Sequence, residues 1–466
     1  MNKLKTLIAT CLILSVSFVA SAQIRVYEGK YAVKFTDKNN SEYSLDKPEQ
    51  FLSNKSIERR NKFGIALDYN DLPVSQVYVD SLRESGFVIH NVSKCLNCAV
   101  IECDSSDLEK LNNFSFLDLQ WRKTVPAPRE AGSNIAYKRG KLSKSEINSD
   151  TTLHYGESAN QIMQINCQSL HNLGYTGKNM TIAVLDAGFH KVDRLPVFQK
   201  MISDKRILGV YDFVDNDTTV YGSDNHGMNV LSCIAADLPY QMIGTAPDCQ
   251  AYLFRTEDGA TENVIEEFNW AAAAEKADSL GVDLIHSSLG YSNFDDISMS
   301  YSTKDIDGQI CFSTIAADIA AGRGILVNVS AGNEGFDAWR FVSAPADADS
   351  VLAIGAVDGM GEYAYFSSRG PSADNRVKPD VCAKGLRTTV QGISGKIAVS
   401  DGTSFSGPVM AGAVLCLMQA HPTAKVMEII EAVRMSGSQY NKPDTYLGYG
   451  IPDFAIAHKI LLAKGL

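Results

Sequence analysis

From about residue 155 onward, short apolar runs alternate with longer helical segments, and this alternation constrains the fold more than any other feature. Apolar runs typical of buried strands occur at 181–186, 251–254, 282–288, 325–330 and 351–357. Helical segments occur between and after these runs, at 226–235, 263–280, 314–322 and 409–418. Such an alternation predicts an α/β fold in which a mostly parallel sheet is flanked by helices.

The chain before this region divides into two parts. The first part, residues 23–125, mixes strand-like runs at 24–35 and 99–103 with helical stretches at 47–63, 74–85 and 106–112. This mixture predicts a small α+β domain. Residues 126–154 lose all apolar periodicity, because proline, glycine and lysine interrupt the pattern, and they are typical of an exposed linker. We therefore expect a small domain, a linker and an α/β domain over 155–466.

The first 22 residues have the layout of a secretory signal peptide. Lys3 and Lys5 precede an apolar run over 7–19, and the small residues of 20–22 follow it. The run is too short for a membrane anchor, which needs about 20 apolar residues. No other stretch is judged long and apolar enough to cross a membrane. A secreted protein is expected, in the periplasm, on the cell surface or outside the cell.

Composition excludes some functions and leaves others open. The 466 residues are 45% hydrophobic and carry a net charge of −11, which argues against nucleic-acid binding, because such proteins usually carry a basic face. Apart from Cys11 in the expected signal peptide, nine cysteines remain. Cys95 and Cys98 have redox or zinc spacing but lack a second pair. Export permits disulfides, and free buried thiols are the alternative.

Two side chains with catalytic potential lie at the boundaries of the expected strands and helices. Asp186 ends the apolar run 181–186, where an unpaired carboxylate is costly. His226 begins the helix 226–235 and is followed by Gly227, which permits close approach to the imidazole. Taken alone, each has an ordinary alternative, as a turn aspartate and as a helix-capping histidine. His154, His171 and His190 are the rival histidines, and none has the context of His226.

Two further residues complete a possible site. Ser404 precedes the buried helix 409–418, whose positive end favours negative charge on a carbonyl under attack. Pro408 is tolerable near the start of that helix; the alternative role for Ser404 is a helix N-cap. Asn333 follows the strand 325–330 between glycines, where its amide could donate to an oxyanion or merely form a turn.

The order Asp186, His226, Ser404 along the chain is that of subtilisin and not of chymotrypsin or the α/β-hydrolases. At this point residues 155–460 resemble the catalytic domain of the subtilisin-like serine proteases, the subtilase family. The resemblance rests on six stretches: 181–188 around Asp186, 225–227 around His226, 331–335 around Asn333, 402–408 around Ser404, 288–290, and 366–371 followed by 378–381.

The resemblance implies a secreted serine endopeptidase that needs no cofactor for its chemistry and acts on polypeptides. Ser404 would be the nucleophile, His226 the base, Asp186 the residue that orients it, and Asn333 an oxyanion-hole donor. Two walls of the pocket for the residue before the cut are implied by analogy, with a floor near residues 343–345. These walls are Ser288, Leu289 and Gly290 on one side and Ser330, Ala331 and Gly332 on the other. Since none of these is charged, we expect an apolar or aromatic residue there.

Residues 23–125 more loosely resemble subtilase pro-segments, so the chain itself would supply an intramolecular inhibitor. Processing would then occur in the linker, which contains Lys138 and Arg139. Structural calcium is common in the family, but Asp212, Asp215 and Asp217 are more simply solvated loop acids, and we assign no metal ligand.

The sequence departs from the family pattern near the site. Ala187 replaces the usual Ser or Thr, Met228 and Asn229 replace Thr and a second His, and Gly407 replaces Ala or Ser. None of these changes removes a reacting group. The alternative function is a catalytically inactive subtilase-fold protein that binds peptides. A P-loop is excluded because the glycines of 174–178 are too close together and precede the strand, and Ser406 breaks the hydrolase Gly-x-Ser-x-Gly pattern.

Overall fold

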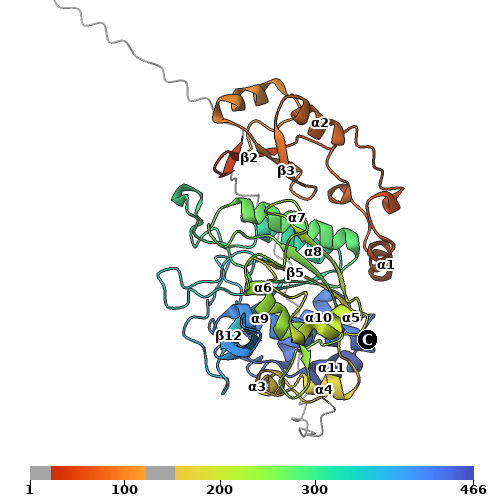
Figure 1. The fold of residues 1–466 in the computed structure, drawn as a ribbon, viewed down its shortest axis with the longest axis vertical. Helices are drawn as coiled ribbons and strands as arrows, with labels where there is room; N and C mark the ends of the chain where they lie inside the picture. The colour runs from red at the N-terminus through yellow and green to blue at the C-terminus, as the bar shows by residue number, and fades with distance from the viewer. Residues whose placement is uncertain (1–22, 122–152) are drawn as a thin grey trace, which may run out of the picture.

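The computed structural model describes residues 23–121 and 153–466. The expected signal peptide, nearly all of the expected linker, and Lys138 with Arg139 lie outside these residues. Within them, a small N-terminal region of residues 23–121 lies over two helices of a larger α/β region of residues 153–466 (Figure 1). We call these the N-terminal region and the α/β region.

The α/β region is built on a seven-stranded sheet in which every neighbouring pair is parallel, as predicted. The strand order is β13-β12-β11-β10-β5-β9-β6, so the chain runs from β5 to one edge at β6 and then back across the sheet to the other edge, which leaves β5 between β9 and β10. In such sheets, sites form at the carboxyl ends of the strands near the point where the strand order reverses. The strands are β5 (Thr181–Asp186), β6 (Ile207–Asp212), β9 (Gln250–Arg255), β10 (Leu284–Ser287), β11 (Leu326–Ser330), β12 (Leu352–Val357) and β13 (Val381–Lys384).

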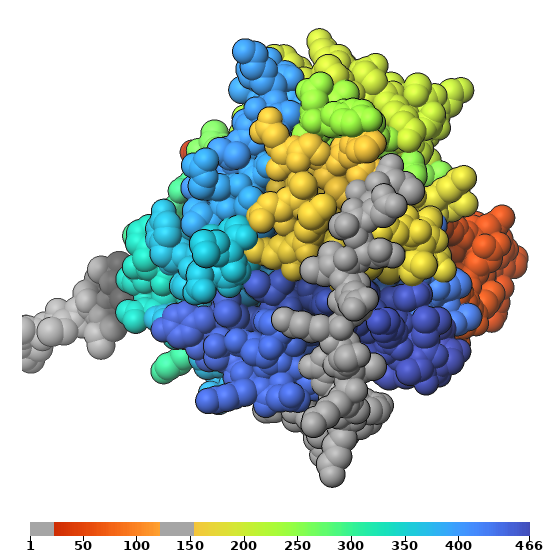
Figure 2. All heavy atoms as spheres, turned by 90° about the horizontal axis from the view of Figure 1, so that it is seen from below, coloured from red at the N-terminus to blue at the C-terminus, as the bar shows by residue number. Residues whose placement is uncertain are grey.

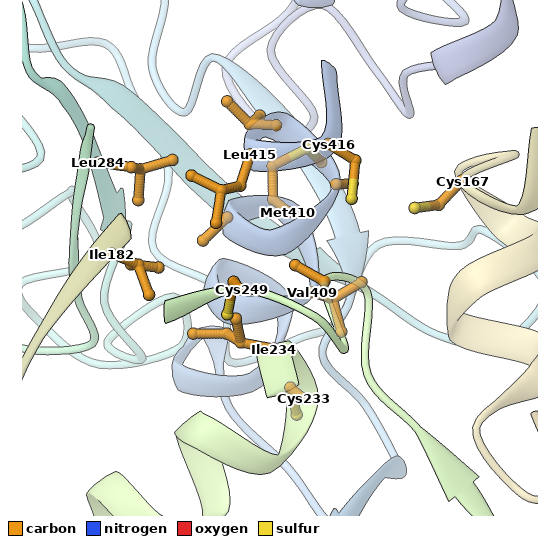
Figure 3. Packing of buried hydrophobic residues seen from close by; sticks show 14 of the residues in the cluster. Cys167, Ile182, Cys233, Ile234, Cys249, Leu284, Val409, Met410, Leu415 and Cys416 are labelled. Atoms are coloured by element: carbon orange, nitrogen blue, oxygen red, sulfur yellow. The ribbon is translucent and has the colours of Figure 1, made fainter. Parts of the chain in front are cut away.

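Helices cover both faces of this sheet, and successive strand residues point to opposite faces. Ile182 and Val184 of β5 pack with α6 (His226–Ala235) and α9 (Thr403–Ala420), whereas Ala183 and Leu185 pack with α7 (Ile265–Leu280) and α8 (Phe312–Gly322). Figure 3 shows α9 at the centre of the first layer, with Val409, Met410 and Leu415 pointing into the apolar packing. The sheet is therefore buried on both sides, which explains its nearly unbroken apolar strands.

The remaining elements of the α/β region surround this core. Two small antiparallel pairs are formed, β7 (Asp237–Leu238) with β8 (Met242–Ile243), and β14 (Thr388–Gln391) with β15 (Ile397–Ser400). Figure 2 shows the first helices of the region beside its last ones, and Phe454 N–H donates to the Ile165 carbonyl there. These helices are α3 (Ala159–Gln164), α4 (Gln168–Asn172), α5 (Gln199–Ser203), α10 (Val426–Ser436) and α11 (Phe454–Ala463).

The N-terminal region contains a four-stranded antiparallel sheet of order β1-β2-β4-β3. One face of this sheet packs on the α/β region, and the opposite face is covered by α2. Val33, Ala99 and Ile101 face α2 in a small core, while Ala32 and Val100 face the α/β region. Its elements are β1 (Ile24–Tyr27), β2 (Lys30–Lys34), α1 (Asn54–Phe63), α2 (Gln76–Glu84), β3 (Val88–Ser93) and β4 (Cys98–Glu102), with 3₁₀ helices at Pro48–Gln50, Tyr69–Asp71 and Ser105–Asn113.

Buried charges join the two regions beside α1, which stands apart from the N-terminal sheet and reaches down the side of the α/β region (Figure 1). The guanidinium groups of Arg59 and Arg60 pair with the two carboxylate oxygens of Asp278 on α7, at 2.6 and 2.8 Å. Burial alone would raise the pKa of Asp278, but Lys94, Arg60 and Arg59 outweigh it and lower that pKa to about 2. We call Arg59, Arg60 and Asp278 the arginine clamp.

A second polar contact joins the N-terminal sheet to α7. The carboxylate of Glu275 accepts hydrogen bonds from the Lys94 and Cys95 N–H groups at 2.8 and 2.9 Å, and from the Ser93 hydroxyl at 2.6 Å. Beyond the sheet, the Trp121 ring packs edge-on against Phe268 and Phe312. The N-terminal region thus rests on α7 and α8 through both apolar and charged contacts.

The structure corrects several sequence predictions in detail. The run 24–35 is two strands that turn at Gly29, and the helix expected over 47–63 is broken before Ser53, whose hydroxyl caps α1 by accepting from Ser56 N–H. β3 was not predicted at all. By contrast, α6 has the predicted bounds, and α7 ends at Gly281, which has the left-handed backbone (φ 79°) that glycine tolerates best.

Two expectations about burial are also resolved. All nine cysteines in the described residues are free thiols, and most are buried, so none forms a disulfide there. One helix in the described residues, α9, is long and apolar enough to cross a membrane, contrary to the expectation that no stretch after the signal peptide is. Because 83% of it is buried inside the protein, its apolar character has a simpler cause, which is its place in the core.

Candidate active site

Asp186 and His226 are brought together at the carboxyl end of the central strand. Asp186 is the last residue of β5 and is fully buried, and its Oδ1 lies 2.8 Å from His226 Nδ1. Burial opposes protonation of His226, but the Asp186 carboxylate outweighs it and raises the pKa of the imidazole. A histidine held in this way can accept a proton and keep it while a reaction proceeds.

The approach of these two side chains depends on Gly227. A Cβ atom at this position would lie 2.5 Å from the Gly188 carbonyl oxygen and 2.9 Å from Asp186 Cβ, so no other residue fits. The close approach that Gly227 permits is thus that of Gly188 and Asp186 to its own backbone, and the predicted approach to the imidazole stays a prediction. Among the rival histidines, His171 is buried and lies 2.7 Å from the Tyr155 hydroxyl, away from Asp186.

Ser404 lies in the first turn of α9, and its side chain is nearly buried. The helix begins at Thr403, after Gly402, so Ser404 is not the N-cap that the alternative interpretation required. Its hydroxyl donates to the Ser288 carbonyl at 3.4 Å, in the resting arrangement described here, and not to His226. The His226 ring lies close by, because its centroid is 5.9 Å from the ring of Phe405, the residue that follows Ser404.

The side-chain amide of Asn333 is held through its oxygen, and its nitrogen is not part of these hydrogen bonds. Its Oδ1 accepts hydrogen bonds from the N–H and hydroxyl of Thr403, at 2.8 and 3.0 Å. Its Nδ2 lies 3.7 Å from the place that a Cβ on Gly402 would occupy. The amide nitrogen therefore lies beside Gly402, two residues before Ser404.

The two predicted pocket walls converge on Ser343. A Cβ on Gly290 would lie 3.1 Å from Ser343 Cβ, and one on Gly332 would lie 3.0 Å from Ser343 Oγ. Ser288, Ser330 and Ala331 are buried behind these glycines, and Leu289 packs partly buried against the apolar layer of α7 and α8.

Sequence reasoning missed a carboxylate at this pocket. Glu334 Oε2 accepts from the Ser368 hydroxyl at 2.6 Å, lies 3.4 Å from Ser343 Oγ, and would contact any Cβ placed on Gly332. The predicted wall residues are uncharged, but the carboxylate next to them was not considered in the predicted preference for an apolar or aromatic residue. Glu334 directly follows Asn333, and this position could have indicated a charged side chain near the wall. The stretch 331–335 was interpreted only for the role of Asn333.

Buried glutamates lie near the site on the segment between β9 and α7. Burial raises the pKa of Glu257 to about 8, against the effect of a hydrogen bond from the Tyr291 hydroxyl at 2.6 Å. Burial also raises the pKa of Glu262 to about 7, and Asp295 adds to this effect. Burial therefore favours the neutral form of both carboxyl groups, more strongly for Glu257, which is buried, than for Glu262, which is half-buried.

Among the aspartates considered as calcium ligands, Asp212 is not the solvated loop acid that the sequence predicts, because it is the buried last residue of β6. Asp212 and Asp215 both pair with Arg255 Nη1, at 2.7 and 2.6 Å, and Asp217 Oδ1 accepts from the Thr219 N–H. No group of three or more metal-ligating side chains occurs in residues 23–121 and 153–466.

The chain matches two known protein families over most of its length. Residues 177–450 match the subtilase family, and residues 30–136 match the peptidase S8 propeptide domain of Bacteroidota. The chain is 30% identical to subtilisin E of Bacillus subtilis over 299 residues, which cover 62% of this chain and 68% of that protein. It is also 30% identical to a Bacillus pumilus subtilisin (62% and 94% covered) and 27% identical to subtilisin DY of Bacillus licheniformis (64% and 96%).

Proposed function

The chain belongs to the subtilase family of serine endopeptidases, and we propose that Asp186, His226 and Ser404 are its catalytic triad. The observation that carries this proposal is the 2.8 Å contact between Asp186 and His226 close to the first turn of α9. Two further observations support it: the His226 ring packs against Phe405, the residue after Ser404, and the three residues follow one another in the order that the family uses.

In the proposed reaction, the Ser404 hydroxyl turns from the Ser288 carbonyl and attacks the carbonyl carbon of a peptide bond. His226 takes the hydroxyl proton and then passes it to the leaving amine. Asp186 stays ionised, orients the imidazole and stabilises its charged form. An acyl-enzyme results, which water hydrolyses with His226 again as the base.

The Asn333 amide and the Ser404 backbone N–H would hold the oxyanion of each tetrahedral intermediate. The anchoring of Asn333 Oδ1 by Thr403 supports this role, because a preorganised donor needs no reorientation during the reaction. The N–H of Ser404 belongs to the first turn of α9, where backbone donors lack partners within the helix.

The substrate is a polypeptide, and its preferred residue before the cut is a narrower proposal. The walls formed by Gly290 and Gly332 favour an apolar or aromatic side chain, as the sequence predicts, whereas the Glu334 carboxylate offers a partner to a cationic one. Digestion of a peptide library separates the two, because a strict preference for Lys or Arg would overturn the apolar proposal.

We also propose that residues 23 to about 125 are removed after export by a cut in the linker. The contacts of the N-terminal region with α7 and α8, together with the propeptide match, support an inhibitor that folds on the enzyme. The signal-peptide pattern of residues 1–22 supports secretion.

A fluorophosphonate probe tests the function directly, since it labels a serine only where an activated nucleophile and an oxyanion hole coexist. The purified, processed protein should be labelled at Ser404, and labelled protein should no longer digest casein or peptides. A protein that binds peptides but is not labelled would instead be the inactive alternative.

A further inference from the structure

The helix that carries Ser404 lacks a normal hydrogen bond at the nucleophile itself. In an α-helix the carbonyl of Ser404 would accept from the N–H four residues later, but that residue is Pro408, which has none. The Ser288 hydroxyl donates to this carbonyl instead, at 3.0 Å. The first turn of α9 is therefore held from outside the helix, by the residue that follows β10.

Behind Ser288 stands a histidine that the proposed mechanism does not use. His286 lies on β10, is fully buried, and its Nε2 lies 2.8 Å from Ser288 Oγ. On the other side, Asn328 Nδ2 lies 3.0 Å from His286 Nδ1 and donates to the Gly407 carbonyl at 3.1 Å. Burial lowers the pKa of His286 to about 3, so its ring is neutral.

The directions of these hydrogen bonds follow from their partners. The Gly407 carbonyl can only accept, so it fixes the Asn328 amide with its nitrogen toward His286. The tautomer compatible with this amide has the ring proton on Nε2 and lets His286 Nδ1 accept from Asn328 Nδ2, whereas the opposite tautomer would donate from Nδ1 to the Asn328 backbone carbonyl oxygen, 3.2 Å away. Nε2–H donates to Ser288, which leaves the single Ser288 proton for the Ser404 carbonyl. Every bond in this chain thus points toward the nucleophile.

Gly407 explains why the chain of bonds can form in this protein. A Cβ at residue 407 would lie 2.4 Å from Ser330 Oγ and 3.0 Å from His286 Cε1. The Ala or Ser expected there from the family pattern would displace both side chains. The unusual glycine and the buried histidine are therefore two parts of one arrangement.

We propose that His286 is a positioning residue for catalysis, which acts through Ser288 to fix the carbonyl, and hence the backbone orientation, of Ser404. The inference rests on the proposed function, because it assumes that Ser404 is the nucleophile. The hydrogen bond from Ser288 to the Ser404 carbonyl replaces the helical hydrogen bond that Pro408 cannot donate. Small rotations of this turn change the distance from the Ser404 hydroxyl to His226 and the direction of the Ser404 N–H, and both affect the transition state more than substrate binding.

The test compares the wild-type protein with His286→Leu, His286→Gln and Ser288→Ala, each counted by active-site titration so that only folded molecules contribute. We expect His286→Leu and Ser288→Ala each to lower kcat by about tenfold, the worth of one hydrogen bond in a transition state. KM for a peptide substrate should change by less than about twofold. His286→Gln retains an amide donor at the Nε2 position and should restore most of the loss.

A double variant separates positioning from general damage. In the Ser288→Ala background, His286→Leu should change kcat by less than about twofold, because the link that it acts through is already gone. Equal losses in both backgrounds, or an unchanged kcat in His286→Leu, would overturn the inference. If His286→Leu does not fold, Ser288→Ala still decides, since an unchanged kcat there refutes the relay. Failure of the wild-type protein to be labelled at Ser404 would instead overturn the proposed function.

Discussion

The core of the α/β region and the interface that joins the N-terminal region to it are made of different kinds of side chain. The seven-stranded sheet of the α/β region is covered on both faces by layers in which aliphatic and aromatic side chains predominate. The N-terminal region joins the same molecule through an apolar patch edged by the arginine clamp and by Glu275. Interfaces between separable partners are more polar than protein cores in this way.

The difference indicates which region can leave. Removing a strand from the large sheet would expose its apolar core to water on both faces, whereas the charged groups of the clamp can be hydrated when the regions separate. The N-terminal region also has only a small core of its own, between its sheet and α2. Part of its apolar surface is buried only against the α/β region, so these contacts add to its stability.

The largest test of this comparison is Ser404→Ala. The variant should keep both regions joined as one chain beginning near Gln23, because processing in the linker requires the nucleophile. Peptide hydrolysis should fall by about 10⁶-fold, which is the loss known for subtilisin itself and not a value derived from this structure. Mass spectrometry of the secreted products and a peptide assay measure the two effects. If the Ser404→Ala chain is still cut in the linker when it is produced without the wild-type protein, another protease must make the cut.

Breaking the arginine clamp should separate the regions without touching the chemistry. Asp278→Ala leaves Arg59 buried without a carboxylate partner and removes one of the two carboxylates that pair with Arg60, which should weaken the interface by roughly 3–5 kcal/mol, or about 10²- to 5 × 10³-fold. The measurement is size-exclusion chromatography of a Ser404→Ala protein cut at a site introduced into the linker, so that nothing degrades the released region.

Asp80→Ala is the matched control for the clamp, because its pair with Arg83 is half exposed and within the N-terminal region. Exposed pairs of this kind contribute little, about 0–1 kcal/mol. Dissociation that is equally slow in Asp278→Ala and in the control would mean that the apolar patch alone holds the two regions together.

Asn333→Ala should damage catalysis while leaving the interface intact. We expect kcat to fall by about 10²- to 10³-fold with little change in KM, the magnitude known for the same donor in subtilisin. Thr403 loses an anchor in this variant, so circular dichroism should confirm that α9 persists. A large rise in KM at constant kcat would assign Asn333 to substrate binding.

The smallest expected effect is a change in how kcat/KM depends on pH. The group that titrates lies in the active site and not at the interface between the regions. His226 must be neutral to act as a base, and Asp186 raises its pKa, so kcat/KM should fall on the acid side with a midpoint above 6.5. Asp186→Asn should move this midpoint to lower pH and reduce the rate. The measurement is kcat/KM against pH for both proteins, and an unmoved midpoint would mean that another group limits the rate.

The same shifts set how stability depends on pH. The charged form of His226 is favoured in the folded protein, so its contribution is full below the ordinary pKa of 6.5 and is lost as pH rises through the raised value. Asp278 behaves in the opposite sense, because its contribution is present above its ordinary value and is lost only as pH falls toward about 2. The interface should therefore remain intact through the range in which the active site titrates.

The sequence predicts the α/β region better than the N-terminal region for a physical reason. Strands such as β5 are buried on both faces, so their apolar runs stand out, and residues such as Asp186 mark their ends. β3 is only partly buried along most of its length and includes His90 and Asn91, so no clear alternation reveals it. Its position is determined by pairing with β4 and by Glu275, neither of which a local pattern contains.

Within the site, residues that act through local motifs were found and those that depend on distant partners were not. Asp186, His226, Asn333 and Ser404 each lie in a short recognisable stretch. Nothing in the apolar strand around His286 indicates a polar role, because its partners Asn328 and Gly407 lie far along the chain. The helix start at Thr403 was also missed, since Pro408 suggested a later beginning.

The burial of α9 has a consequence for the lifetime of the enzyme. Residues 403–417 are all buried, and the helix packs beneath the central strands, so the turn that carries Ser404 cannot open without disrupting the surrounding core. Local unfolding of this turn therefore cannot inactivate the enzyme, as it can where a site lies in an exposed, weakly packed segment. Loss of activity on heating should follow the unfolding of the whole α/β region, and its half-life then measures the barrier to that unfolding.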